Sequence, residues 1–116
     1  MKRNLTMDYI EFPVKDIEAT KTFFNELFGW EFTDYGPDYI SFNDGRTDGG
    51  FYKADTVAKV ETGSVLVVVY AEELEPLLEK VKQLSGHINK DIYDFPGGRR
   101  FHFLDPNGNE YAVWSE

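Results

Sequence analysis

The chain has 116 residues, of which 12 are Lys or Arg and 21 are Asp or Glu, giving a formal net charge of −9 at pH 7. This length suits one domain, and the excess negative charge argues against binding to nucleic acid or to an anionic membrane surface. The absence of cysteine excludes disulfides, thiolate metal sites and a cysteine nucleophile. Without a long apolar run or a signal-like start, the expected location is the cytoplasm.

The first half of the chain predicts one strand, one helix and three further strands. Residues 7–14 alternate polar and apolar side chains, as a half-buried strand does, and Asp16 and Gly29 are suited to begin and end the helix that follows. Turn residues then separate three short strand-like segments: Trp30–Asp34, Asp38–Asn43 and Gly49–Lys53.

The second half repeats this order after a predicted linker at residues 55–62. Ser64–Tyr70 is a nearly continuous apolar strand, and Glu72–Leu84 is an amphipathic helix with Pro76 in or beside its first turn and Gly86 at its end. Three strands follow: Ile88–Asp94, Arg100–Leu104 and Glu110–Trp114, the last two joined by the turn Asp105-Pro106-Asn107-Gly108-Asn109.

The two halves match in register. Shifting the sequence by 57 positions pairs Ile17 with Leu74 and Gly29 with Gly86. The pattern therefore predicts two βαβββ modules, at about residues 7–54 and 63–116, and an α+β fold.

Three stretches of the chain carry a resemblance to a known superfamily. They are the run from Glu11 to Trp30, the second helix from Glu73 to Gly86, and the segment Phe103–Asn109. In these stretches the chain resembles the vicinal oxygen chelate superfamily, which includes glyoxalase I, extradiol dioxygenases, and the fosfomycin- and bleomycin-resistance proteins. The resemblance implies one domain over residues 1–116, an incomplete eight-stranded barrel with the helices outside, and a homodimer.

The resemblance also implies where a metal would bind. The superfamily's ligands come from the first strand of each module and from the last strand of one or both, and these positions fall on Tyr9, on Leu66 (Ser64 after a slip of two residues) and on Ala112. A divalent ion needs about three imidazole or carboxylate ligands, which these residues do not supply. We expect no metal and no cofactor.

Strand alternation and the resemblance together give the candidate site residues. Glu11 shares the concave face with Tyr9 and is either a general base, a hydrogen-bond acceptor for a ligand, or a solvated carboxylate at the rim. By resemblance Arg100 and His102 face the substrate, where Arg can pair with a carboxylate or phosphonate and His can transfer a proton, so that Glu11 and His102 are the catalytic candidates. The other predicted ligand-binding residues either line an apolar pocket or pack in the core or a dimer interface: Leu66, Val68, Tyr70, Ala112 and Trp114.

One further segment invites two interpretations. Pro96-Gly97-Gly98-Arg99 is either a mobile loop beside the concave face, whose Arg99 meets an anionic ligand, or a plain turn with an exposed Arg.

These features predict a glyoxalase-like protein that binds a small organic molecule in a concave hydrophobic cup without a metal. Two alternatives stay open. The first is a metal-dependent lyase, isomerase or dioxygenase with a relocated site made of Glu11, His102 and Glu110. The second is a non-catalytic protein-interaction module whose cup is filled by its own side chains.

Overall fold

The computed structural model describes residues 2–116, which form two α-helices, a short 3-10 helix and eight strands. The first half contains β1 (Tyr9–Val14), α1 (Ile17–Phe28), β2 (Glu31–Asp34), β3 (Tyr39–Asn43) and β4 (Asp48–Lys53). The second half contains η1 (Val60–Thr62), β5 (Val67–Tyr70), α2 (Glu75–Gln83), β6 (His87–Phe95), β7 (Gly98–Leu104) and β8 (Glu110–Ser115). Each predicted helix and strand is present within a few residues of its expected bounds; η1, within the predicted linker, was not predicted.

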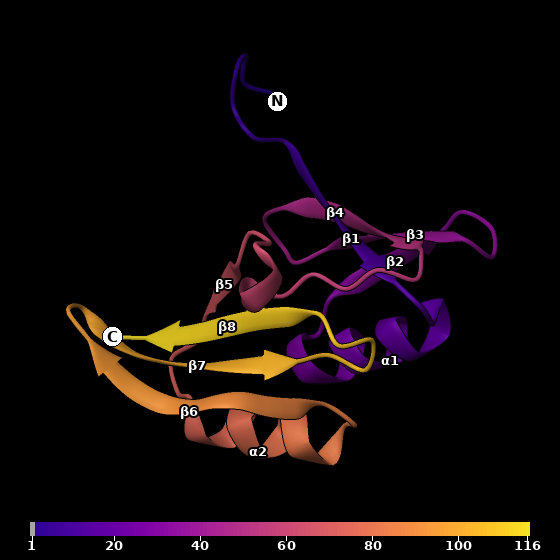
Figure 1. Cartoon of the computed structure of the whole chain (residues 1–116). Helices are drawn as coiled ribbons and strands as arrows, with labels where there is room; N and C mark the ends of the chain where they lie inside the picture. Colours follow the sequence, from indigo (N-terminus) through magenta and orange to yellow (C-terminus); the bar gives the residue numbers. More distant parts are fainter. Residues whose placement is uncertain (1) are drawn as a thin grey trace.

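The strands form two sheets with the same internal order. The first sheet is ordered β1-β4-β3-β2 and the second β5-β8-β7-β6. In each sheet the first strand of the half pairs in parallel with the last, and the remaining pairs are antiparallel. The predicted α+β fold of two βαβββ repeats is confirmed, and the sheets remain separate rather than closing into one barrel (Figure 1).

The ends of α1 are set by the two residues expected to cap it. The Asp16 side chain accepts a hydrogen bond from the Ala19 backbone N–H at 3.0 Å, and Gly29 has a φ of 76°, with its N–H donating to the Asn25 carbonyl. Glycine adopts a left-handed backbone conformation at little energetic cost, so α1 ends here and the chain turns directly into β2.

The predicted helix Glu72–Leu84 starts three residues before α2 and ends one residue after it. Pro76 lies in the first turn as expected, but the helix ends at Gln83, and the left-handed residue is Ser85, with a φ of 72°. Gly86 is required for a different reason, because a Cβ there would come within 3.0 Å of the Leu104 carbonyl and closer still to Val81.

A single hydrophobic cluster lies between the sheets and the helices. It joins Phe12, Phe24 and Phe51 from the first half to Phe103 and Tyr111 from the second, with ring centroids 5.1 to 5.6 Å apart for Phe12–Tyr111, Phe24–Tyr111 and Phe24–Phe51. Each sheet therefore presents one face to this common core and leaves its other face outside it.

The turn between β7 and β8 is tied to the first half. The Asn107 side chain accepts hydrogen bonds from the backbone N–H groups of Lys15 and Asp16 at 2.9 and 3.1 Å, and Asn109 donates to the Pro13 carbonyl. Asp105 is buried and accepts from the N–H groups of Asn107 and Asn109 and from the Tyr111 hydroxyl. This turn, which the superfamily resemblance singled out, thus fastens the two halves together.

None of the helices within residues 2–116 is both long and apolar enough to cross a membrane.

Candidate functional site

The candidate site lies on the face of the second sheet that points away from the common core. Strand alternation buries Phe101 and Phe103 of β7 in the core and turns Arg100 and His102 to the opposite face. Glu110 and Trp114 of β8 share that face, since β7 pairs with β8 so that Arg100 lies opposite Trp114.

A buried His–Glu pair forms the base of this face. His102 Nδ1 lies 2.8 Å from Glu110 Oε2, and their side chains are only 5% and 6% exposed. Glu110 also accepts from the Val60 backbone N–H at 3.0 Å and from the Asn89 side-chain amide at 3.1 Å. Burial alone would raise the pKa of Glu110, but these hydrogen bonds, with that of His102 first among them, hold the pKa below its ordinary value. Glu110 is therefore a carboxylate, and His102 Nδ1 carries a proton.

Tyr93 connects the His–Glu pair to an arginine. Its hydroxyl lies 3.0 Å from His102 Nε2 and accepts a hydrogen bond from Arg100 Nε. The Lys90 ammonium lies 5.1 Å from the centre of the Tyr93 ring. The side chains thus form one line, Arg100–Tyr93–His102–Glu110, which we call the relay.

Two irregularities in β6 direct side chains into this relay. Pairing shifts by one residue between Ile88 and Lys90, and again between Lys90 and Tyr93, as bulges do. As a result Ile88 packs against the core, while Tyr93 lies opposite Arg100 on the outer face. Without these two shifts Tyr93 would lie on the same face but opposite Gly98, two residues along β7 from Arg100.

Aromatic rings border the relay. The Tyr70 and Trp114 rings meet edge to face with centroids 5.2 Å apart, and Phe95 lies 6.2 Å from Trp114. The Arg100 guanidinium lies 5.7 Å from the Phe95 ring centre. The Tyr70 hydroxyl donates a hydrogen bond to Glu116, and this bond raises the pKa of Tyr70.

The first sheet carries a different polar cluster on its outer face. Tyr39 donates to Glu11 at 2.8 Å, and the Tyr9 and Tyr39 hydroxyls are 2.6 Å apart. Since the one proton of Tyr39 is given to Glu11, Tyr9 must donate to Tyr39. Partial burial and these hydrogen bonds raise the pKa of Tyr39, so the phenol is held neutral.

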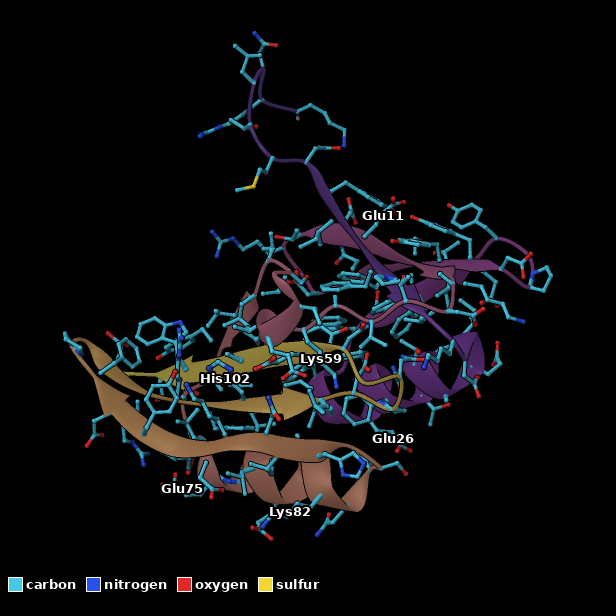
Figure 2. The ribbon with its side chains drawn as sticks, in the orientation of Figure 1. Glu11, Glu26, Lys59, Glu75, Lys82 and His102 are labelled. Carbon is cyan, nitrogen blue, oxygen red and sulfur yellow. The ribbon has the colours of Figure 1, made fainter. Side chains whose placement is uncertain are left out.

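The structure divides the predicted site residues between the two sheets. Arg100, His102, Tyr70 and Trp114 are brought together on the second sheet, whereas Tyr9 and Glu11 are on the first. Figure 2 shows Glu11 and His102 well apart. Within the chain the six are not brought together on one face, because the two sheets turn their inner faces to a common core and their outer faces elsewhere. That the six line one cup stays a prediction. The predicted relocated site of Glu11, His102 and Glu110 does not form within the chain for the same reason.

The remaining predicted lining residues occupy three different environments. Leu66 is half-buried just before β5, Val68 is 41% exposed, and Ala112 is fully buried opposite Val68.

The residues present do not fit a superfamily metal site. Of the three positions carried over, Tyr9 is engaged with Tyr39, while Leu66 and Ala112 have no donor atom. Within residues 2–116 no three His, Cys, Asp or Glu side chains are grouped so that they could hold a metal ion.

The segment expected to be a loop or turn is a tight turn at Pro96 and Gly97, with Gly98 and Arg99 already in β7. Arg99 makes two hydrogen bonds to Glu75, at 2.8 and 3.2 Å. The Glu75 carboxylate of α2 therefore pairs with Arg99, the residue that the sequence suggested as a partner for an anionic ligand.

Two surface hollows lie away from the relay. One of about 590 Å³ is lined mainly by α1 and the start of β2, including Glu18, Lys21 and Glu26. The other, of about 340 Å³, lies beside Lys2 and Arg46. Neither contains a predicted ligand-binding residue.

Sequence reasoning missed Tyr93, Asn89 and Val60. The signal for the first two was present, because the polar run Asn89-Lys90-Asp91 interrupts the apolar alternation of its strand and indicates a bulge. No local signal pointed to Val60, which reaches Glu110 from the predicted linker.

Comparisons with known proteins agree with this fold. Residues 6–113 match the family model described as Glyoxalase/Bleomycin resistance protein/Dioxygenase superfamily, and the chain belongs to this superfamily. Among curated protein sequences none matches the chain significantly.

Solved structures with the same fold share little sequence with the chain. A glyoxalase-related enzyme from Fulvimarina pelagi aligns over 97% of this chain and 88% of its own, with 19% identity and a TM-score of 0.80. The fosfomycin resistance protein FosX from Mesorhizobium loti aligns over 98% and 94%, with 14% identity and a TM-score of 0.76. A lactoylglutathione lyase from Agrobacterium tumefaciens aligns over 98% and 96%, with 18% identity and a TM-score of 0.73.

Proposed function

We propose that this protein binds a small organic anion, with an apolar body, on the outer face of its second sheet. The observation that carries the proposal is the position of Arg100, which reaches from the relay to the aromatic border formed by Tyr70, Phe95 and Trp114. A ligand on this face can place its charge at the guanidinium and its apolar part against the rings.

The remaining donors of Arg100 support this proposal. Arg100 is half-buried, and its Nε is used by Tyr93, while its two Nη groups have no hydrogen-bond partner within residues 2–116. No buried side-chain nitrogen or oxygen of the described residues lacks a partner, so these Nη groups reach solvent. A guanidinium with two accessible donors suits a planar carboxylate or a phosphonate.

The test compares acids with uncharged analogues of equal size. Phenylacetate, indole-3-acetate and 2-naphthoate should raise the melting temperature at millimolar concentration, because a ligand of the folded state stabilises it. The corresponding amides should not. R100Q should lose the shift, and R99Q, which changes the neighbouring arginine bound to Glu75, should keep it. Equal shifts by acids and amides, or no shift by any acid, would contradict the proposal.

We also propose that the protein acts as a homodimer. Val65, Val68 and Tyr70, in and just before the edge strand β5, are 78%, 41% and 48% exposed, and a second copy would cover this apolar strip. Light scattering after gel filtration should give twice the mass of the chain, and V65K should shift the protein toward the monomer. A wild-type monomer at micromolar concentration would contradict this.

A further inference from the structure

The direction of each hydrogen bond in the relay follows from its members. Arg100 can only donate, so the Tyr93 oxygen accepts from it, and the Tyr93 proton is left to donate to His102 Nε2 in the neutral imidazole. His102 Nδ1–H in turn donates to the Glu110 carboxylate. The order is therefore Arg100 to Tyr93 to His102 to Glu110.

This order places a phenol between a cation and a base. The imidazole is held by a buried carboxylate that also receives the Val60 N–H and the Asn89 amide, so the base is fixed in position and in tautomer. Arg100 and Lys90 place positive charge at the phenol oxygen and beside its ring, where negative charge develops when the proton leaves.

We propose that Tyr93 is a proton-transfer residue of the site, and this inference rests on the proposed function, since it requires a ligand at Arg100. An X–H bond of the bound molecule breaks and its proton goes to the Tyr93 oxygen, while the proton of Tyr93 goes to His102 Nε2. The electron pair of the broken bond stays on the substrate. The products are a substrate with one more negative charge and an imidazolium beside Glu110, so total charge is unchanged, and the reverse step returns a proton to the substrate.

The geometry also gives the substrate class. A phenol oxygen has two lone pairs, of which Arg100 uses one, so one remains for the incoming proton. The Nη groups of the same arginine hold an anionic group beside it. The substrate is thus a small carboxylic acid whose acidic C–H or O–H lies one or two bonds from the carboxylate, with an apolar remainder for the Trp114 side of the site.

Chemical labelling of tyrosines by N-acetylimidazole tests the relay without a known substrate. Acetylation requires loss of the phenolic proton, so an adjacent base accelerates it. Peptide mass spectrometry should show Tyr93 acetylated about tenfold faster than Tyr35 or Tyr39. Tyr35 is 64% exposed and Tyr93 half-buried, so exposure alone predicts the opposite order. Tyr39 is the matched control, because its proton is held by a carboxylate and not by an imidazole.

Two variants and one spectrum separate the relay from a purely structural network. H102Q should slow acetylation of Tyr93 about tenfold and leave Tyr35 unchanged, with E110Q giving a smaller effect in the same direction. If H102Q does not fold, imidazole nitrogen NMR of the wild-type protein decides, and it should show His102 protonated at Nδ1 with Nε2 accepting. Tyr93 reacting no faster than Tyr35, an unchanged rate in H102Q, or the opposite tautomer would each overturn the proposal.

Protection experiments distinguish this inference from the proposed function. Phenylpyruvate should protect Tyr93 from acetylation in the wild type and not in R100Q, whereas phenylacetamide should protect it in neither. Fast labelling of Tyr93 without protection by any acid would retain the relay and overturn the substrate class. Binding of acids with slow labelling of Tyr93 would retain the proposed function and overturn proton transfer.

Discussion

The outer face of each sheet carries a chain of hydrogen-bonded side chains that ends at a carboxylate, but the two chains differ in how deeply they are buried. On the first sheet Tyr9 donates to Tyr39 and Tyr39 to Glu11, all near solvent, whereas on the second the relay ends at a carboxylate that is 6% exposed. The turns between the last two strands of each half differ similarly: Asp44 between β3 and β4 is exposed, and Asp105 between β7 and β8 is buried.

This difference shows that a repeated backbone does not imply repeated chemistry. Six of the seven buried polar residues of the described chain lie in the second half: His102, Asp105, Asn107, Asn109, Glu110 and Ser115. A buried polar group is costly when it loses a partner, and an exposed one is not, because water replaces the partner. Matched substitutions in the two halves should therefore have unequal effects.

The largest effect is expected at Asp105. In D105N an amide NH2 group replaces one carboxylate oxygen and faces N–H or O–H donors, so hydrogen bonds are lost in a buried place. The unfolding free energy should fall by about 2–4 kcal/mol. Burial raises the pKa of Asp105, so removing its charge offsets part of this loss. D44N, in the exposed turn of the first half, should cost less than about 1 kcal/mol. Urea denaturation at neutral pH measures both, and equal losses would contradict the comparison.

Glu110 and Glu11 form the second pair. E110Q should cost about 2 kcal/mol, because the amide cannot accept from all three donors, and E11Q about 0.5 kcal/mol or less.

The pH dependence of E110Q follows from the lowered pKa of Glu110. A carboxyl group whose pKa is lower in the folded state stabilises the fold above its unfolded value near 4.5, and this contribution is lost as pH falls through the folded value. Urea midpoints of the wild type should therefore decrease more steeply than those of E110Q as pH falls below about 4.5. Parallel curves would show that Glu110 is not held as a carboxylate.

Glycines on the two sheets provide a third comparison. A Cβ at Gly98 would collide with the Ser115 backbone carbonyl, whereas one at Gly50 would meet the hydroxyl ends of Tyr39 and Tyr9, which can swing outward. We expect G98A to cost about 1–3 kcal/mol and G50A less than about 1 kcal/mol. Calorimetric melting measures both, and a larger loss in G50A would show that the tyrosine cluster is rigid.

The smallest effects are expected at surface ion pairs. Arg99 holds Glu75 through two hydrogen bonds, which lower the pKa of the carboxyl group, and Lys21 of the first half lies 3.4 Å from Asp34. R99A should lower the urea midpoint slightly and K21A less, and salt should reduce the difference. A loss of stability in R99A as large as that in G98A would mean that this pair fixes β7 against α2.

The fold was predictable because each element has a local signal. Asp16 and Gly29 cap α1, and the alternation of Ile10, Phe12 and Val14 sets which face of β1 is buried. The repeat at 57 positions then predicted that the second half has the same sequence of elements as the first. The role of Gly86 at the end of α2 was misjudged, because this glycine is required by close packing and not by a left-handed turn.

The site was predictable only in part, because its assembly depends on contacts between distant strands. Arg100 and His102 followed from the resemblance and from alternation, and they are brought together with Trp114. Tyr93 lies opposite Arg100 because two bulges shift the pairing of β6 by two residues, and the alternation of side chains along the strand does not give the size of that shift. The position of Glu11 on a separate face could not be predicted from the sequence, since the relative orientation of the two sheets depends on tertiary contacts and not on a local sequence pattern.

The turn at residues 105–109 also has a consequence for how the chain is made. Asn107 bonds to a backbone group 92 positions earlier, and Asn109 to one 96 positions earlier. During synthesis the loop between β1 and α1 has to wait for these late residues, and bonds that close such long loops slow the search for the native state. A truncated polypeptide that ends before this turn would leave backbone groups near its N-terminus without hydrogen-bond partners. Such a polypeptide would be recognised by chaperones and proteases.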